Sequence, residues 1–522
     1  MKTGVEYPPR PQRLSCLLTD LVQVDAANDP PISGLALDSR QVTPGDLFFA
    51  RAGQRTHGLR HVAEAIEAGA AAVVCEGWGR EDDAPGEVRV GHDEAAVPVY
   101  RVEDLQRWLG RIAARFYGDP SEDIAVTGIT GTNGKTSCSH FLAQALDAAC
   151  PPCGVIGTLG YGHYGALRPG RHTTPDAITL QARLAQMRQE GVRQVVMEVS
   201  SHALDQGRVA GVRFHTAVFT NLSRDHLDYH GDFASYAAAK ARLFQVEGLR
   251  HAVINGDDET GQRLLATLPA EPDVVVYGLR DGVSAPAGRQ GMQGGEVRYV
   301  QGDIVRHDSE GMELCIASSW GAGCFRTRLL GRFNASNLLA TLAVLLAQGM
   351  PLAQAMARLA DTHPVSGRME HFGGGQGRPL VVIDYAHTPD ALRQVLETLR
   401  PLCQGRLWVV FGCGGDRDRG KRRDMGEVAA RCADQVILTD DNPRTEDGAR
   451  IIAEIAAGMG ERPAVEIVRD RARAIARAIG AAGQNDVVLI AGKGHEEYQI
   501  VGERCIPFSD REQVAQALRE VA

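Results

Sequence analysis

The chain has 522 residues, of which 44% are hydrophobic and 23% are charged, and its formal net charge at pH 7 is −9. This length exceeds what one hydrophobic core organises and predicts about three folded domains, while the composition excludes a disordered chain. The net negative charge argues against sequence-independent binding to nucleic acid, which requires clustered Lys and Arg side chains.

The lack of long apolar runs and the spacing of the cysteines bear on the cellular compartment of the protein. The N-terminal segment "MKTGVEYPPRPQRLSCLL" has no long apolar region, and no run of about 18 apolar residues occurs in the chain. We therefore expect a cytoplasmic protein without membrane insertion. The 11 cysteines lack the spacing of a disulfide framework, so we expect reduced thiols. Cys150 and Cys153 have redox-motif spacing but follow a helical segment, and we interpret the two prolines between them as a helix stop.

The first hundred residues alternate short apolar runs with turns. Strands are predicted in "GLALDSR", "GDLFFARAG" and "AAVVCEG", and an Ala-rich helix in "HVAEAIEAGA". This pattern predicts a small α/β domain over residues 1–103. Residues 103–117 then have helical periodicity and lead into the strand "IAVTGIT".

The middle of the chain, residues 104–364, alternates strands with helices. The predicted strands include "RQVVMEVS", "TAVFTNL" and "HAVING", which indicates a parallel sheet wound by crossover helices. A Gly-rich stretch over 281–296 precedes the alternating segment "ELCIASSWGAGCFRTRLL". We expect this segment to form an antiparallel addition to the sheet.

A third domain is expected over residues 365–522. Its four predicted strands, "PLVVIDYAH", "RLWVVFGCGGD", "DQVILTDDNPR" and "DVVLIAGKGHE", each end in a polar or Gly-rich loop. Ligands of parallel sheets bind beyond the carboxyl ends of the strands, so these loops should face one site. The sequence thus predicts an α/β protein of three domains: a small N-terminal one, a central one built on a parallel sheet, and a C-terminal one whose strands end in polar or Gly-rich loops.

A variant phosphate-binding loop follows the first central strand. The segment "GITGTNGKTS" runs from Gly128 to Ser137, and it carries Ile129 where a standard loop has its first Gly. A strand, a Gly-rich turn and a helix nevertheless follow one another, so backbone N–H groups can cradle phosphates. Lys135 can neutralise the outer phosphates and Thr136 can offer its hydroxyl to Mg²⁺. The alternative is a Gly-rich turn without a ligand.

Four further polar residues allow a structural and a functional interpretation. Glu198 follows a buried strand, and this position fits either a Mg²⁺ ligand or a paired core acid. His226 and His230 have a spacing compatible with zinc, but no third zinc-type ligand accompanies them, so zinc is disfavoured. Lys240 lies on the predicted helix "YAAAKARLF", where by itself it reads as a surface lysine.

Eight motifs in a fixed order then identify a family. They are "GTNGKT", "EVSSHALDQGR", "SRDHLDYHG", "GRFNASN", "DYAHTPDAL", "FGCGGDRDRGKR", "DNPR" and "GKGHE", and together they resemble the Mur ligases over nearly the whole chain. The resemblance implies an ATP-dependent amide ligase of peptidoglycan precursor synthesis that works through an acyl phosphate. It also implies that the small N-terminal α/β domain binds the UDP end of the substrate, that the central domain is an ATPase domain with a P-loop-type parallel sheet, and that the C-terminal domain is Rossmann-like. It implies three small-molecule substrates, namely ATP, a UDP-muramoyl dipeptide and meso-diaminopimelate. We expect a monomer.

The resemblance also assigns roles, residue by residue. ATP-binding residues would be Gly131, Thr132, Asn133, Gly134, Lys135, Thr136, Ser137, Asn334 and Asn337. Residues binding the UDP-muramoyl dipeptide would be Leu37, Ser39, Gln54, Arg55, Thr56, His172, Thr173, Thr174, Ser200, Gln206 and Arg208. Residues binding diaminopimelate would be Arg417, Asp441, Asn442, Pro443, Arg444, Gly492 and Glu496.

Catalytic and metal-binding roles follow in the same way. The resemblance implies Mg²⁺ held by Thr136, Glu198, His226 and Lys240, with Lys240 carrying a CO₂-derived carbamate. The catalytic residues would be Lys135, Glu198, His226, Lys240 and His387, while the individual roles of His387 and Asp384 stay open.

Simpler interpretations and other functions compete with these assignments. Asn334 and Asn337 could only cap a helix, Arg208 could be a surface charge, and "DNPR" could be a Pro turn with a solvated Arg444. Alternative functions are a ligase that adds L-lysine, a ligase like folylpolyglutamate synthase, or a P-loop ATPase that acts as a switch or motor. A switch or motor should hydrolyse ATP without an amino-acid substrate.

Overall fold

The computed structural model describes most of the chain, namely residues 10–51, 57–76, 87–90, 97–149, 152–280, 297–308, 310–375, 377–460 and 465–521. The chain divides into two compact units, each held together by contacts among its own residues. The first unit contains residues up to 128 and the segments 149–217 and 242–250. The second unit contains the segments 129–148, 218–241 and 251–522.

The N-terminal domain is built on a five-stranded sheet. In spatial order its strands are β3 (Gly34–Ala36), β4 (Asp46–Ala50), β5 (Ala72–Glu76), β7 (Val97–Val102) and β6 (Glu87–Val90). All neighbours pair in parallel except β6, which is antiparallel to β7. Two short strands, β1 (Gln12–Arg13) and β2 (Pro31–Ile32), form a separate pair, and the helices are α1 (Leu14–Leu17) and α2 (Val62–Glu67). The strands and the helix predicted here are confirmed.

Helix α3 (Leu105–Phe116) follows this sheet and confirms the predicted helix over 103–117. Its apolar residues Leu105, Leu109, Ile112 and Phe116 recur every three or four positions, so they lie on one face. That face is buried in one hydrophobic cluster with residues of the N-terminal sheet. The periodicity of the sequence therefore explains how this helix is anchored.

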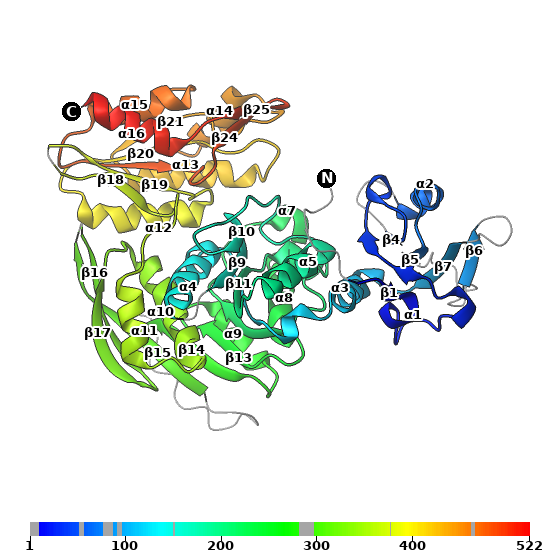
Figure 1. Ribbon diagram of the computed structural model, residues 1–522. Coiled ribbons are helices and arrows are strands. Elements are labelled where there is room, and N and C mark those ends of the chain that lie inside the picture. The colour runs from blue at the N-terminus through cyan, green and yellow to red at the C-terminus, as the bar shows by residue number, and fades with distance from the viewer. Residues whose placement is uncertain are drawn as a thin grey trace. The chain divides into compact units, whose positions relative to one another are not determined.

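A ten-stranded sheet follows helix α3 along the chain (Figure 1). In spatial order its strands are β10 (Gly160–His163), β9 (Cys153–Gly157), β11 (Gln194–Glu198), β8 (Ala125–Thr130), β12 (Phe214–Phe219), β13 (His251–Asn255), β14 (Asp273–Leu279), β15 (Val297–Asp308), β16 (Gly311–Ser318) and β17 (Gly321–Thr327). The helices along this part are α4 (Lys135–Ala149), α5 (Ala177–Gln189), α6 (Ser201–Asp205), α7 (Leu227–His230), α8 (Phe233–Ala241), α9 (Glu259–Thr267), α10 (Arg332–Ala347) and α11 (Leu352–Ala360). Shorter 3-10 helices of the chain lie at Ala26–Asn28, Ser39–Gln41, Gly58–His61, Pro120–Glu122, Arg242–Gln245 and Arg400–Leu402.

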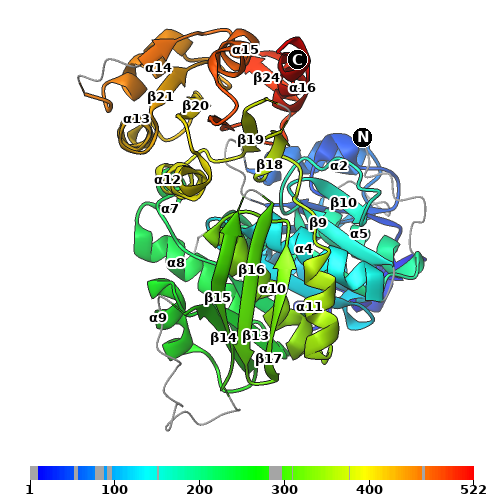
Figure 2. The same ribbon diagram turned by 90° about the vertical axis from the view of Figure 1, so that its left-hand side faces the viewer.

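The antiparallel addition predicted after the Gly-rich stretch is confirmed by β15, β16 and β17. These strands pair antiparallel and run side by side (Figure 2). The Gly-rich stretch itself, 281–296, lies outside the described residues. The chain thus continues one sheet by local hairpins after a series of crossover helices.

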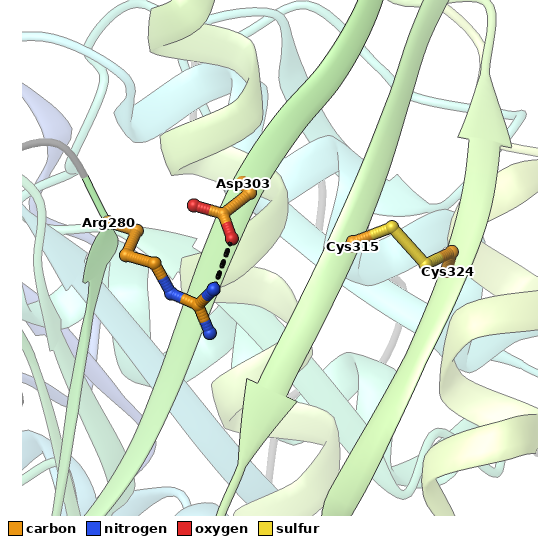
Figure 3. The surroundings of a disulfide bond; sticks show 4 residues. All are labelled: Arg280, Asp303, Cys315 and Cys324. Carbon is orange, nitrogen blue, oxygen red and sulfur yellow. Dashed lines mark ion pairs between the residues drawn. A yellow bond between two sulfur atoms is a disulfide. The ribbon is translucent and has the colours of Figure 1, made fainter.

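One cysteine pair contradicts the expectation of reduced thiols. Cys315 on β16 and Cys324 on β17 form a disulfide, with Cα atoms 4.1 Å apart (Figure 3). The two residues are direct partners in the register of β16 and β17, and this pairing brings their side chains together. The other described cysteines do not take part in a disulfide. Among them is Cys153, while Cys150 lies outside the described residues.

The C-terminal domain is a six-stranded sheet covered on both faces. In spatial order its strands are β18 (Glu370–Gly373), β19 (Leu380–Asp384), β23 (Val487–Ala491), β20 (Leu407–Phe411), β21 (Gln435–Leu438) and β22 (Val465–Ile467). Its helices are α12 (Pro389–Leu399), α13 (Gly420–Cys432), α14 (Gly448–Ala456), α15 (Arg471–Ala481) and α16 (Asp510–Glu520), and a hairpin of β24 (Tyr498–Val501) and β25 (Arg504–Pro507) is separate.

Alternate residues of these strands belong to two separate cores. Val382 and Leu489 lie in the cluster with α12, α13 and α14, whereas Val381, Ile383 and Val488 lie in the cluster with α15 and α16. Strands buried on both faces read as continuous apolar runs, as "LVVID" and "VVLIA" do. The four parallel strands predicted here are confirmed as neighbours in the order β19, β23, β20 and β21.

The fold class is confirmed as three α/β domains. Within the described part of the chain, no helix is both long enough and apolar enough to cross a membrane.

Candidate active site

The loop between β8 and α4 has the geometry of a phosphate cradle. Gly131 and Gly134 have positive φ values of 148° and 87°, which side chains other than Gly rarely adopt. A Cβ on Gly131 would collide with the Thr220 hydroxyl, and one on Gly134 with the Asn337 amide. These glycines are therefore required by conformation and by space. The N-terminal N–H groups of α4 follow directly, as anion binding requires.

Two residues that the sequence analysis missed fix this loop from the segment after β12. The Asn221 carbonyl accepts a hydrogen bond from Thr132 N at 2.8 Å, and its side-chain oxygen accepts one from Asn133 N at 3.0 Å. The Thr220 hydroxyl donates to the Asn133 carbonyl at 2.6 Å. The cradle is thus held rigid before any ligand binds, which lowers the entropic cost of binding.

Two lysines converge on this loop. Lys135 Nζ donates to the carbonyl oxygens of Gly131 and Thr132 at 2.8 and 2.9 Å. Lys240 Nζ donates to the same Gly131 oxygen at 2.8 Å and lies 4.5 Å from the centre of the Tyr236 ring. Lys240 is 2% exposed, so its interpretation as a surface lysine is wrong. Burial and then the charge of Lys135 hold the pKa of Lys240 well below its ordinary value, which favours a neutral amine.

His226 and its neighbour Asp225 lie beside these lysines. His226 has a positive φ of 54°, and its Nε2 is 3.3 Å from the Asp225 carboxylate. Burial lowers the pKa of His226, and the charges of Lys135 and Lys240 lower it further, against the raising effect of Asp225. The imidazole is therefore neutral near pH 7, which is the form that binds a cation. Asp225 is a polar group of this region that the sequence analysis missed.

Asn337 packs against the phosphate loop from α10. Its side-chain amide donates to Asn334 Oδ1 at 3.3 Å, and Asn334 donates to the Leu330 carbonyl at 2.9 Å. Both side chains are buried, and the N-cap of α10 is Gly331 without a side-chain cap. The alternative of two capping residues is therefore wrong.

Glu198 is the last residue of β11 and is fully buried. Thr158 donates to both of its side-chain oxygens, from the backbone N–H at 2.8 Å and from the hydroxyl at 3.0 Å. The Thr174 hydroxyl donates to the Glu198 carbonyl oxygen at 2.9 Å, and Thr173 shares a hydrogen bond with Thr158 at 3.1 Å. The carboxylate is thus oriented by Thr158, and the loop that the sequence analysis assigned to the peptide substrate contacts Thr158 and the Glu198 backbone.

Other residues assigned to the dipeptide gather around the same loop. Arg208 donates to the Thr174 carbonyl at 3.0 Å and to Gln206 Oε1 at 2.9 and 2.6 Å, so it is not a free surface charge. Thr174 also donates to the Ser200 hydroxyl at 3.4 Å. His172 is exposed, and burial together with the charge of Arg208 lowers its pKa.

The predicted uridine residues are described only in part. Ser39 donates to Glu64 at 3.1 Å, and Leu37 packs at the edge of the N-terminal core. Gln54, Arg55 and Thr56 lie outside the described residues. The structure therefore places Leu37 and Ser39 without testing their role.

The C-terminal sheet gathers most of the residues assigned to the amino acid. Asn442 Nδ2 donates to Glu496 Oε2 at 2.8 Å, which joins the loops after β21 and β23. Gly492 has a φ of 111°, and a Cβ there would meet the Asp441 carboxylate at 2.6 Å. Burial raises the pKa of Asp441, against the opposing charges of Arg471 and Lys493. These loops form one polar cluster, as the parallel strand order predicts.

Arg444 is part of this cluster and is not a solvated side chain. It has a φ of 52°, is half-buried, and donates from Nη1 to the Gly415 carbonyl at 2.7 Å. Pro443 precedes it and is buried. A Cβ on Gly414 would lie 2.9 Å from Arg444 Nη1 and 3.7 Å from Arg417 Cγ, so both arginines border the same loop. The alternative of a Pro turn with a solvated arginine is therefore wrong.

Asp384 and His387 occupy the loop after β19. Asp384 accepts a hydrogen bond from Met369 N at 2.8 Å, and burial raises its pKa to about 6. His387 Nδ1 contacts the Tyr385 carbonyl at 2.8 Å, and burial lowers its pKa to about 4. Arg368, which the sequence analysis missed, stacks 4.3 Å from the centre of the Tyr385 ring and lies 3.5 Å from Thr136 Oγ1.

Among the described residues, no three His, Cys, Asp or Glu side chains come together in a group that could hold a metal ion.

The buried Asp384 gives a pH-dependent stability. Because its folded pKa lies above the ordinary 3.8, the folded state binds more protons than the unfolded state between pH 4 and 6, and stability falls as pH rises through this range. Asp384→Asn keeps an oxygen for Met369 N but removes the ionisation. Its unfolding free energy relative to wild type should therefore rise by up to about 3 kcal/mol from pH 4 to 7, as measured by denaturant titration.

Asp486→Asn is the matched control with the opposite sign. N–H groups of Arg406, Gly483 and Trp408 lower the pKa of Asp486 despite its burial, so this variant should lose stability relative to wild type as pH rises. A pH-independent difference for Asp384→Asn would contradict the assigned ionisation.

Three family profiles match successive parts of the chain. They are the Mur ligase family catalytic domain over residues 31–117, the Mur ligase middle domain over 129–345 and the Mur ligase glutamate ligase domain over 367–494.

Individual relatives match over nearly the full length. A UDP-N-acetylmuramoyl-L-alanyl-D-glutamate–2,6-diaminopimelate ligase from Alkalilimnicola ehrlichii is 51% identical over 508 residues, which is 97% of this chain and 99% of that protein. The protein of the same name from Pseudomonas aeruginosa is 49% identical and covers 94% of this chain and 96% of its own length. A solved structure of a ligase with this name is 34% identical, with a TM-score of 0.68 over 98% of this chain and 99% of that chain.

Proposed function

This chain belongs to the Mur ligase family, and on that premise we propose that it joins meso-2,6-diaminopimelate to UDP-N-acetylmuramoyl-L-alanyl-D-glutamate at the expense of ATP. The observation that carries the choice of amino acid is the cluster of Asp441, Asn442, Arg444, Gly492 and Glu496 at the carboxyl edge of the C-terminal sheet. Relatives that share about half of the sequence are named for this reaction.

The reaction needs a better electrophile than a carboxylate. In the proposed first step, the side-chain carboxylate of the D-glutamyl residue attacks the γ-phosphorus of ATP, and ADP leaves. The backbone N–H groups of residues 131–136 and the ammonium of Lys135 stabilise the charge on the transferring group. The amine of the amino acid then attacks the acyl carbon, phosphate leaves with the bonding electrons, and the nitrogen loses a proton. The product is an amide, ADP and phosphate.

Mur ligases use ATP together with Mg²⁺. The donors available here fit this ion, because a Thr136 hydroxyl, the buried Glu198 carboxylate and the neutral His226 are hard or borderline ligands. Mg²⁺ commonly takes only one or two protein carboxylates and completes its shell with phosphates and water, so a protein cluster of three acids is not required. When bound, the ion would neutralise phosphate charge. Thr136, Glu198, His226 and Lys240 would hold it.

We propose roles for the remaining residues on the same basis. Thr173, Thr174, Ser200, Gln206 and Arg208 would bind the muramoyl dipeptide, because their hydrogen bonds form one network around Glu198. His172, Leu37 and Ser39, with Gln54, Arg55 and Thr56, would complete the site for the UDP-muramoyl moiety, and Asn334 with Asn337 the site for ATP. We propose that all substrates are small molecules and that the protein acts as a monomer in the cytoplasm.

A ligase couples ATP turnover to its acceptors, whereas a switch or motor does not. We expect release of ADP and phosphate only when the UDP-muramoyl dipeptide is present, measured with a coupled ADP assay. Lys135→Ala should lower kcat by about 100-fold or more, because the cradle loses its cation. Arg263→Ala, on the exposed face of α9, is the control and should behave as wild type. Rapid ATP hydrolysis without the dipeptide would reject the ligase assignment.

We propose that Lys240 carries a carbamate. The amine lone pair attacks CO₂, the new nitrogen loses a proton to water, and a carboxylate forms that can face the metal. The burial of Lys240 and its lowered pKa support this step, because only the neutral amine is nucleophilic. Carbamylation would also exchange a cation beside Lys135 for an anion.

Labelled bicarbonate tests the carbamate. The wild type should show one carbamate resonance by ¹³C NMR, and Lys240→Ala should lose both the resonance and about 10- to 100-fold in kcat, with partial rescue by short carboxylic acids. Full activity of the wild type in CO₂-free buffer without a resonance would contradict the proposal.

Arg444 should select diaminopimelate over L-lysine, because diaminopimelate has a second carboxylate that a guanidinium can bind bidentately. In wild type, kcat/KM for the two amino acids should differ by a factor on the order of 10⁴ or more. Arg444→Ala should reduce this preference and leave the KM for ATP unchanged. Arg450→Ala, an exposed arginine on α14, is the control. Equal kcat/KM values of the wild type for the two amino acids would show that this loop does not recognise the second carboxylate of diaminopimelate.

A further inference from the structure

Lys493 is a fully buried lysine that lies outside the set of residues proposed to bind the substrates. It follows Gly492 at the carboxyl end of β23, and its side chain is 0% exposed. The chain has only five lysines and uses arginine for its other 51 basic side chains. A lysine in a closed position is therefore unusual for this protein, and its compact ammonium differs in geometry from a guanidinium.

Its ammonium contacts two residues of the proposed amino-acid site. Lys493 Nζ donates to Glu496 Oε2 at 3.1 Å and to Asn442 Oδ1 at 3.2 Å. Asn442 Nδ2 in turn donates to the same Glu496 oxygen at 2.8 Å. The three side chains thus form a closed triangle, with the Tyr498 ring centre 5.6 Å from the ammonium.

The triangle fixes which way the Asn442 amide points. An ammonium only donates, so the side of the amide that faces Lys493 must be the oxygen. The backbone N–H of Ile500 donates to the same oxygen at 2.9 Å, which gives the same orientation. The Asn442 NH₂ group is therefore directed to Glu496 and has a second hydrogen available for a ligand acceptor.

Glu496 is oriented in the same way. Its Oε2 accepts from both Lys493 and Asn442, and among the described residues all hydrogen bonds that its side chain makes go to this oxygen. Oε1 is thus left to accept from another donor. A carboxylate with one oxygen bound by the protein and one available can receive an ammonium in a defined direction.

We propose that Lys493 is a positioning residue for amino-acid recognition. It holds Asn442 and Glu496 so that an amide donor and a carboxylate acceptor face one amino-acid terminus, whose carboxylate and ammonium they match. This inference rests on the proposed function, in which Asn442 and Glu496 bind the incoming amino acid. It adds a group that never touches the substrate but sets the geometry of two groups that do.

A purely structural ion pair is the alternative, and kinetics separate the two. Removing the partner of a buried charge destabilises any fold, so a loss of stability alone does not distinguish them. A positioning role instead raises the KM for the amino acid while the KM values for ATP and the dipeptide stay constant. Arg471, equally buried and paired with Asp510, is a matched control because its side chain donates hydrogen bonds to Asp510 and to the Ala491 carbonyl and not to Asn442 or Glu496.

The experiment compares Lys493→Met, Lys493→Arg and Arg471→Met in the full-length enzyme. Both Lys493 variants should raise the KM for diaminopimelate by about 10- to 100-fold, the factor that corresponds to one lost hydrogen bond to a charged group. The KM values for ATP and the dipeptide should change by less than about threefold, as should all KM values of Arg471→Met. Lys493→Arg retains the cation, so it also reports if Lys493→Met does not fold.

A double variant tests the mechanism of the effect. If Lys493 acts through Glu496, adding Lys493→Met to Glu496→Gln should raise the KM for the amino acid no further than Glu496→Gln alone. A diaminopimelate KM within twofold of wild type for Lys493→Arg, or additive effects in the double variant, would overturn the inference. If the wild type uses a different amino acid, the proposed substrate is wrong, and the same comparison is then made with the amino acid that it does use.

Discussion

The carbonyl oxygen of Gly131 accepts hydrogen bonds from two lysines, and the chemistry of the phosphate loop depends on this shared contact. Two ammonium groups on one oxygen repel each other, most strongly where water is excluded. Lys135 is partly exposed whereas Lys240 is buried, so Lys240 is the side chain whose pKa is lowered. The carbonyl of Gly131, between β8 and α4, thus brings a buried amine of lowered pKa next to Lys135.

In the C-terminal domain, a second buried lysine lies beside a group of opposite charge. Lys493 is as buried as Lys240, but it faces the carboxylate of Glu496 instead of a second cation. One buried amine therefore lies beside a second lysine, which lowers its pKa, and the other lies in an ion pair. Position relative to other charges, and not burial alone, decides the chemistry of each lysine.

Several buried polar residues of the candidate site lie at the carboxyl ends of parallel strands or directly beyond them. Glu198 ends β11, Asp384 ends β19, and Lys493 lies just beyond β23. Each strand is held in a buried sheet, so its last residue has little freedom, while the loop beyond it is free to vary. Buried polar residues at these ends are then oriented by short hydrogen bonds, as Thr158 orients Glu198 and Met369 N contacts Asp384.

The sequence by itself determined the alternation of strands and helices, the phosphate loop and the edge of the sheet at which polar loops meet. These features follow from local periodicity and from the rule that parallel strands share one carboxyl edge. It did not determine that Lys240 is buried, that Cys315 bonds Cys324, or that Lys493 orients Asn442. Lys493 and Asn442 are 51 positions apart, and Lys240 and Gly131 are 109 apart. Burial and hydrogen-bond partners at such separations arise only when distant strands and helices pack together, so only the tertiary structure decided them.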